Sequence, residues 1–168
     1  MRTVELLGDD QLDRAVRAAW RRLDQTGLSA LARHQHPTSR PHLTLASAEQ
    51  LPPGAAAALA DALRALPIQV RLDRLRFFGG RAGVLAWVAD GGVALRDLQA
   101  QVWSALDGAD RNPQHEPGTW TPHISLARRL RPEQAPLAAV ALGGIVAAGT
   151  LDRARSYDSV TRTVTSLP

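Results

Sequence analysis

A short segment with the pattern Pro-His-aliphatic-hydroxyl-Leu occurs twice in this chain. Residues 40–45 read RPHLTL and residues 120–126 read WTPHISL, and the two histidines lie 81 positions apart. Such a repeat indicates a duplicated structural unit. Each copy falls in a predicted strand that a predicted helix follows, so we expect the chain to fold into two related halves.

The alternation of side chains along a strand divides each copy into a polar face and an apolar face. His42 and Thr44 share one face in the first copy, and His123 and Ser125 share one face in the second. The aliphatic residues between and after them can pack under a helix. If an approximate two-fold relates the halves, the polar faces meet across a groove and place two imidazoles on opposite sides of one ligand.

Two imidazoles and two hydroxyls suit phosphoryl transfer without a metal ion. One neutral histidine takes a proton from the attacking water or hydroxyl, and the other, as imidazolium, protonates the departing oxygen. The hydroxyls of Thr44 and Ser125 can donate to the nonbridging oxygens, where charge accumulates as phosphorus becomes five-coordinate. A strained 2′,3′-cyclic phosphate is an ester that such a pair can open.

At these residues the chain resembles the two-histidine (2H) phosphoesterase superfamily, in particular its 2′-5′ RNA ligase-like and cyclic nucleotide phosphodiesterase branch. The signature of that family is two His-x-Thr/Ser-x motifs about 80 residues apart, which HLTL and HISL match. The resemblance implies a bilobal α+β fold over nearly the whole chain. It also implies a phosphodiesterase that acts on 2′,3′-cyclic phosphates of RNA ends or nucleotides, or that carries out reversible 2′-5′ ligation.

The resemblance further implies roles for individual residues. His42 and His123 are the expected catalytic acid/base pair, and Thr44 and Ser125 are expected to hold the phosphate. Arg128 stands where some relatives carry an arginine that contacts phosphate, although strict alternation directs it to the face opposite His123, so this role requires a twist or a strand end there. Tyr157 is the candidate for stacking on a base.

The composition narrows the chemistry. All 20 basic residues are arginine, and there is no lysine and no cysteine. Schiff-base chemistry, a Walker-type phosphate loop, a thiol nucleophile and cysteine metal sites are therefore excluded. We interpret the arginine excess and the abundant alanine mainly as coding bias, although arginine is also the better bidentate phosphate ligand.

Apolar periodicity and turn residues predict alternating strands and helices. The predicted strands cover residues 3–7, 42–47, 68–72, 84–88, 121–127, 145–155 and 159–166. The predicted helices run from Asp9 or Asp10 to Gly27, from Pro52 to about Leu66, from about Leu95 to Gly108, and onward from about Pro132. A slip of the apolar phase before Leu75 and Phe77 indicates a bulge, and Gly79 and Gly80 are expected to turn the chain back.

The 168 residues suffice for one domain, and no segment reads as a linker. We therefore expect a single bilobal α+β domain over residues 1–168, with two antiparallel sheets backed by helices and a central groove. Asp9 and Asp10 interrupt any secretory apolar stretch, which favours a cytoplasmic protein. The longest uncharged run, residues 134–151, contains Pro136, Gly143 and Gly144 and is too short for a membrane span. We expect a monomer.

Several other residues have alternative interpretations. His34, His36 and His42 would be the ligands in a metallohydrolase, but no carboxylate stands at a convincing spacing, so we expect no metal and no cofactor. The loop with His115 and Glu116 is either a flap beside the groove or, more simply, surface. The remaining candidates are a basic rim for RNA, made of Arg71, Arg74, Arg76, Arg153 and Arg155, and four core tryptophans, Trp20, Trp87, Trp103 and Trp120.

The favoured function is thus a metal-independent phosphodiesterase whose substrate is an RNA end or a small nucleotide. The main rival is a module that binds RNA or a nucleotide with the same fold but without turnover. The two differ in whether the protein turns such a substrate over or only binds it.

Overall fold

The computed structural model describes residues 1–33, 38–79 and 82–168. Within these residues, antiparallel strands form one sheet in the order β1-β2-β5-β4-β3-β6-β7, and β1 also pairs with β6. The strands are β1 (Arg2–Gly8), β2 (Leu43–Ala48), β3 (Ile68–Phe78), β4 (Gly83–Asp90), β5 (His123–Leu130), β6 (Ala147–Asp158) and β7 (Thr163–Leu167). The helices are α1 (Asp10–Gln25), α2 (Ala55–Leu63), α3 (Gly92–Ala105) and α4 (Ala135–Leu142).

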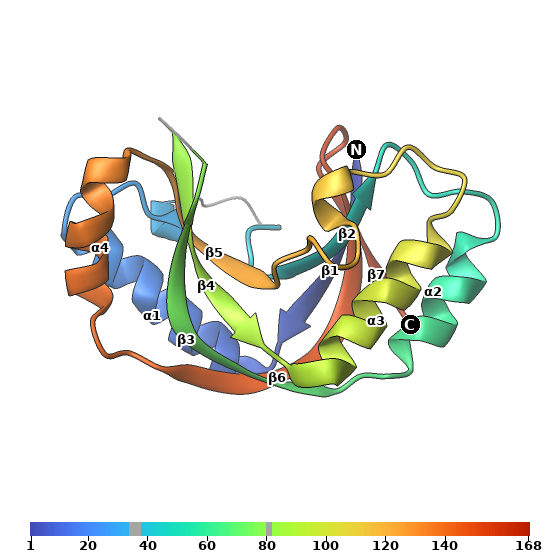
Figure 1. Ribbon diagram of the computed structural model, residues 1–168, viewed down its shortest axis with the longest axis horizontal. Coiled ribbons are helices and arrows are strands. Elements are labelled where there is room, and N and C mark those ends of the chain that lie inside the picture. Colours follow the sequence, from blue (N-terminus) through green and yellow to red (C-terminus); the bar gives the residue numbers. More distant parts are fainter. Residues whose placement is uncertain (34–37, 80–81) are drawn as a thin grey trace.

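The molecule has two lobes (Figure 1). In one lobe, α1 packs against β5, β6 and α4, beside the arm formed by β3, β4 and β5. In the other, α2 and α3 pack together beside β1, β2 and β7. Strands β2 and β5 meet at the middle of the molecule, where Leu43 pairs with Ile124, and diverge from there into the two lobes. The α+β class and the bilobal shape expected from the sequence are therefore confirmed.

The two expected sheets are joined by hydrogen bonds into one. The first part of β6 pairs with β3, through Ala147 to Leu151, and the rest pairs with β1 and β7. At the opposite side, β2 meets β5 where Leu43 lies opposite Ile124. The expectation of two separate sheets was wrong, because the long strand β6 and the pairing of β2 with β5 connect the lobes.

Helix α1 shows why these residues form these elements. Its apolar positions are buried at helical spacing, at Leu12, Val16, Ala19, Trp20 and Leu23. The carboxylate of Asp9 caps the helix by accepting from the backbone N–H of Leu12 at 2.8 Å, and it also accepts from the N–H of Thr150 in β6 at 2.9 Å. One side chain thus fixes both the start of the helix and its position on the sheet.

The strand predictions agree with the structure except at some ends. The bulge before Leu75 is confirmed, because the register with β4 shifts between Leu72 and Arg74. Gly80 lies outside the described residues. The last strand begins at Thr163 rather than at residue 159, because the carboxylate of Asp158 accepts from the N–H of Val160 and closes a turn there. No helix in the described part of the chain is long and apolar enough to cross a membrane.

Candidate active site

The two repeated motifs meet at the point where β2 and β5 cross. Leu43 and Ile124 are paired there, and both are buried in the core. Neighbours of a paired residue point to the opposite face of a strand. His42 and Thr44 therefore share one face of the sheet with His123 and Ser125, which is the arrangement expected from the repeat, although the strands are neighbours in one sheet.

Both imidazoles are oriented in the same way. Nδ1 of His42 donates to the carbonyl oxygen of Arg40 at 2.7 Å, and Nδ1 of His123 donates to that of Thr121 at 2.8 Å. Because a carbonyl oxygen only accepts, each Nδ1 carries a proton. Each ring then has Nε2 as the nitrogen that can take up or give away a proton during a reaction.

The surroundings of His123 favour its neutral form. Its ring lies 4.6 Å from that of Phe78, between centroids. Burial is the largest cause that lowers the pKa of His123, and the nearby cationic groups of His42, Arg128 and Arg76 lower it further. The bond to the carbonyl of Thr121 acts in the opposite direction without cancelling these effects.

The surroundings of His42 are different, because a buried carboxylate faces it. Nε2 of His42 lies 3.7 Å from Oε1 of Glu5. Glu5 accepts from Nε of Arg155 at 2.8 Å and from the hydroxyl of Thr3 at 2.7 Å. Arg155 in turn donates to the carbonyl of Thr38 at 3.0 Å. Glu5 was not among the predicted site residues, and its only signal in the sequence is that it is a lone acid between Val4 and Leu6 in a predicted strand.

A bulge in β5 returns Arg128 to the face that carries His123. Ala86 of β4 lies opposite Ser125, but Leu85 lies opposite Ala127, so that Leu126 has no partner. This extra residue shifts the alternation by one position. A bulge, rather than the expected twist or strand end, thus turns the side chain of Arg128, which lines a cavity together with His42 and Thr44.

The first motif contains an equivalent bulge. Glu5 lies opposite Thr44 and Val4 opposite Ala46, which leaves Leu45 without a partner. Ser47 therefore takes the position in β2 that Arg128 takes in β5. Its hydroxyl lies 3.1 Å from Nδ1 of His115, whose pKa is lowered by burial and, secondarily, by the charge of His123.

The loop that carries His115 is therefore packed against the site rather than being plain surface. The buried side chain of Gln99 donates to the carbonyl of His115 at 2.6 Å and to that of Leu45 at 3.2 Å. This fixes the loop to β2. The pairing of Ser47 with His115 has no local signal in the sequence, because the two residues lie 68 positions apart.

The cavity beside the first motif, which we call the site cavity, measures about 500 Å³. Tyr157, the predicted base-stacking residue, lines it, whereas His123 and Ser125 are not among its lining residues. Its charged or potentially hydrogen-bonding lining side chains include Glu5, Arg40, His42, Thr44, Arg128, Arg155, Tyr157 and Arg162. It is thus rich in guanidinium groups next to one imidazole.

The remaining predicted residues have mostly structural contacts. The indole N–H of Trp120 donates to the carbonyl of Thr44, and that of Trp20 donates to the carbonyl of Ser125, each at 3.0 Å. The predicted core positions of Trp20 and Trp87 are confirmed, since both are buried, while Trp103 and Trp120 are partly buried. The backbone at both hydroxyl-bearing motif residues, Thr44 and Ser125, is therefore fixed by a hydrogen bond from a tryptophan side chain.

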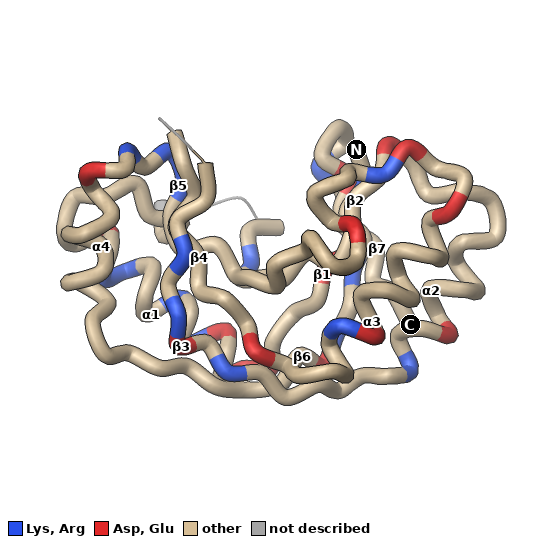
Figure 2. Tube along the Cα trace, viewed as in Figure 1, with Lys and Arg blue, Asp and Glu red and all other residues tan. Residues whose placement is uncertain are grey.

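The arginines of the predicted basic rim are mostly engaged in contacts with neighbouring side chains. Basic residues are spread over both lobes, with a run along β3 (Figure 2). On that strand Arg71 and Arg74 pair with Asp73, and Arg76 donates to Thr121. Arg153 and Arg155 pair with Asp152 and Glu5.

The metal alternative rests on residues that are only partly described. His34 and His36 lie outside the described residues. Among the residues that the structure describes, no three histidine, aspartate or glutamate side chains are grouped as metal ligands.

Two His-x-Thr/Ser motifs on crossing strands of a bilobal α+β fold define a two-histidine phosphoesterase-type enzyme. The family model of the 2′-5′ RNA ligase superfamily matches residues 9–161, and the chain belongs to that superfamily. The resemblance inferred from the motifs is thereby confirmed.

Solved structures with this fold include Usb1 from Kluyveromyces marxianus. The structure of that protein with uridine monophosphate is 12% identical, with a TM-score of 0.60 over 99% of this chain and 97% of that one. A second Usb1 structure from the same organism gives a TM-score of 0.58 at the same identity and coverage. Comparison with curated protein sequences finds no match.

Proposed function

We propose that this protein is a metal-independent phosphodiesterase that hydrolyses 2′,3′-cyclic phosphates on RNA ends or on nucleotides. The observation that carries the proposal is the meeting of both motifs at Leu43 and Ile124, with each histidine's Nδ1 held by a backbone carbonyl. Two imidazoles fixed in one tautomer on one face suit acid/base catalysis at a phosphate. A binding module without turnover has no need of this arrangement.

The different surroundings of the histidines support different roles. His123 takes a proton from the attacking water as that water bonds to phosphorus. His42 gives its Nε2 proton to the ribose oxygen as the bond between that oxygen and phosphorus breaks. The lowered pKa of His123 supports the role of base, and the carboxylate of Glu5 beside His42 supports a cationic acid. His123 gains one proton and His42 loses one during the reaction. Exchange of protons with solvent then returns both histidines to their starting states.

The phosphate oxygens have donors on the same face. We assign Thr44 and Ser125 to the nonbridging oxygens, with Arg128 as the guanidinium that neutralises their charge. The bulge at Leu126 supports the assignment of Arg128, because it brings that residue back to the side of Ser125. These groups act where negative charge increases in the transition state.

The test is hydrolysis of a panel of 2′,3′-cyclic nucleotides and of oligonucleotides that end in a cyclic phosphate, with EDTA present. We expect turnover in EDTA, and a loss of about 100-fold or more in kcat for His42→Ala and for His123→Ala. His115→Asn is the matched control, since it changes a histidine outside the motifs, and its loss should be at least ten times smaller than theirs.

Three outcomes would contradict the proposal. Wild-type rates in both motif variants would exclude these histidines as the acid/base pair. Loss of turnover in EDTA would favour a metallohydrolase. Binding of the panel without turnover would favour the non-catalytic module. Formation of a 2′-5′ linkage from a cyclic end and a 5′-hydroxyl would not contradict the proposal but would show that the reaction also runs in the ligase direction.

A further inference from the structure

A second cavity adjoins the site cavity along β6. It measures about 640 Å³. Tyr157, Arg155 and Arg153 alternate along one face of this strand, because they lie opposite Thr3, Glu5 and Leu7 of β1. Tyr157 lines the site cavity, Arg153 lines the second cavity and Arg155 lines both. Arg155 and Arg153 therefore continue from the site cavity into the second cavity along one face of β6, while Ala154 and its partner Leu167 line the second cavity from the opposite face.

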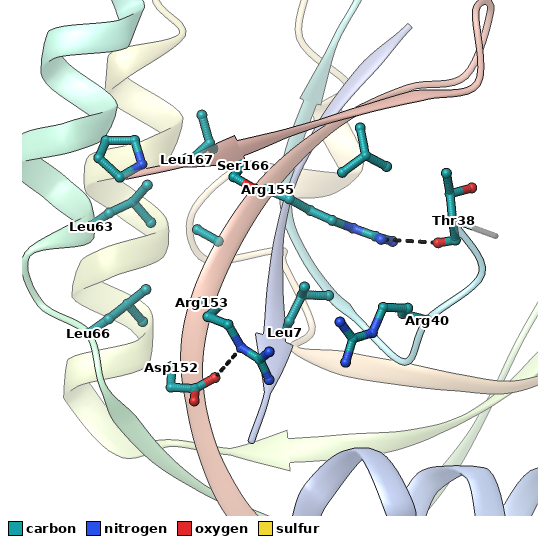
Figure 3. A pocket seen from close by; sticks show the side chains of 13 residues that line it. Leu7, Thr38, Arg40, Leu63, Leu66, Asp152, Arg153, Arg155, Ser166 and Leu167 are labelled. Atoms are coloured by element: carbon teal, nitrogen blue, oxygen red, sulfur yellow. Dashed lines mark hydrogen bonds and ion pairs between the residues drawn. The ribbon is translucent and has the colours of Figure 1, made fainter. Parts of the chain in front are cut away.

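The chain segment before the first motif forms the other shared wall. Thr38 and Arg40 line both cavities. The bond from Arg155 to the carbonyl of Thr38 crosses between β6 and this segment (Figure 3). Arg40, which stands two residues before His42, therefore belongs to the wall that the two cavities share.

The second cavity combines an apolar wall with guanidinium groups. Figure 3 shows the side chains of Arg153 and Arg40 extending from opposite sides toward the same space. Arg153 is oriented by bonds to the carboxylate of Asp152 at 3.1 Å and the carbonyl of Gly8 at 2.6 Å. The apolar lining includes Leu7, Leu63, Leu66, Ala154, Val164 and Leu167.

This combination fits a nucleotide. A base has flat apolar faces and polar edges, which match the leucine wall and the guanidinium donors, and a phosphodiester matches a guanidinium. The volume lies in the range of about 300 to 1,000 Å³ that small-ligand sites occupy. Arg40 carries charge for such a phosphate, since its ion pair with Asp13 is long, at 3.7 Å.

We propose that the second cavity binds the penultimate nucleotide of an RNA whose terminal cyclic phosphate lies at the two motif histidines. This inference rests on the proposed function and deepens it, because it makes the substrate an oligonucleotide rather than a mononucleotide. The phosphodiester that joins the last two nucleotides then lies at Arg40, on the wall that both cavities share.

The experiment compares kcat/KM for a 2′,3′-cyclic mononucleotide and for a dinucleotide that ends in the same cyclic nucleotide. Wild type is expected to prefer the dinucleotide by about tenfold or more. Ser166→Trp places a large side chain in the second cavity from an exposed position of β7, and Arg153→Gln removes its guanidinium. Both variants should lose most of the dinucleotide preference and keep kcat/KM for the mononucleotide within about twofold.

Arg131→Gln is the matched control for the charge. Arg131 is an exposed arginine that pairs with a nearby carboxylate, that of Glu133, at 3.1 Å, much as Arg153 pairs with Asp152, but it follows β5 in the other lobe. This variant should leave kcat/KM unchanged for both substrates. Thermal midpoints of all three variants are measured alongside, so that a folding defect is recognised by equal losses with both substrates and a lowered midpoint.

The outcomes separate the two proposals. A hydrolysed mononucleotide without dinucleotide preference, or an unchanged preference in Ser166→Trp, overturns the second cavity as a nucleotide site and leaves the proposed function standing. If neither substrate is turned over, the proposed function fails. The proposal for the second cavity is then tested by ligand binding instead of by turnover. In that case a dinucleotide 3′-monophosphate must bind wild type at least tenfold more tightly than a mononucleotide and lose this advantage in Ser166→Trp.

Discussion

Glu5 shows how much depends on single side chains in this site. Its carboxylate is buried and joins Arg155, Thr3 and His42, which come from β6, β1 and the start of β2. Arg155 is buried as well. A buried ion pair stabilises little compared with apolar packing, but loss of one partner leaves the other charge buried without compensation. Glu5 therefore affects both the fold and the orientation of His42.

We predict that Glu5→Gln lowers the free energy of unfolding by about 3 to 5 kcal/mol, because the guanidinium of Arg155 stays buried without a counter-charge. Urea denaturation monitored by circular dichroism measures the change. Asp61→Asn breaks the exposed pair with Arg64 and should have no measurable effect. The double variant Glu5→Gln with Arg155→Met should recover part of the loss. A loss in the double variant as large as in the single one would show that the unpaired charge is not the cause.

The pKa of His123 provides a second prediction at this scale. Removal of a nearby positive charge stabilises the imidazolium, so Arg76→Gln should raise the pKa of His123 toward its ordinary value. Because a base must be neutral, the loss of activity on the acidic side should then begin at a higher pH than in wild type. NMR titration of the imidazole measures the pKa directly. Arg71→Gln, on the same strand, should leave it unchanged, and a fall in Arg76→Gln would contradict the electrostatic explanation.

At the level of elements, the bulges at Leu45 and Leu126 determine which side chains reach the site. Alternation alone predicted the common face of His42 and Thr44 correctly, because these residues precede the bulge. It directed Arg128 to the wrong face, since a bulge depends on the partner strand and leaves no clear mark in one sequence. The pairing of Ser47 with His115 was missed for the same reason: it depends on contacts between distant segments.

Helix α1 gives a prediction for this scale. Asp9→Ala removes the cap of the helix and the bond to Thr150 of β6, and we expect a loss of about 1 to 2 kcal/mol in the free energy of unfolding. Asp9→Asn keeps an acceptor and should cost less. Asp10→Ala is the control, because Asp10 is exposed in the first turn and is not the cap. Equal effects of the Asp9 and Asp10 alanine variants, measured by thermal unfolding, would exclude the capping bond as the cause.

For the whole molecule, the order of strands and helices was predictable from periodicity and turn residues, while the sheet was not. Local patterns fix where a strand lies but not which strand it pairs with. The repeat suggested two halves, and the crossing of Leu43 with Ile124 agrees with that suggestion. The continuity of β6 across both halves had no signal, because its 12 residues read as one ordinary strand.

The net charge of +4 leads to a prediction for RNA binding. Arginine contacts to phosphates release counterions, so binding of a short RNA to the His123→Ala variant should weaken as salt rises from about 50 to 200 mM. Fluorescence anisotropy with a labelled oligonucleotide measures the dissociation constant. An oligonucleotide with uncharged methylphosphonate linkages is the control and should show a shallower dependence. Equal slopes for the two would mean that guanidinium–phosphate contacts do not dominate binding.

The double pairing of β6 has a mechanical consequence. Because this strand is hydrogen-bonded to β3 in its first part and to β1 and β7 in its second, the lobes cannot swing apart as hinged bodies without breaking sheet bonds. The proposed site is therefore preorganised. The entropy cost of ordering its side chains arises during folding, so it does not reduce the free energy of each substrate-binding event. We expect substrate to enter an already open and rigid trough, with no domain closure limiting turnover.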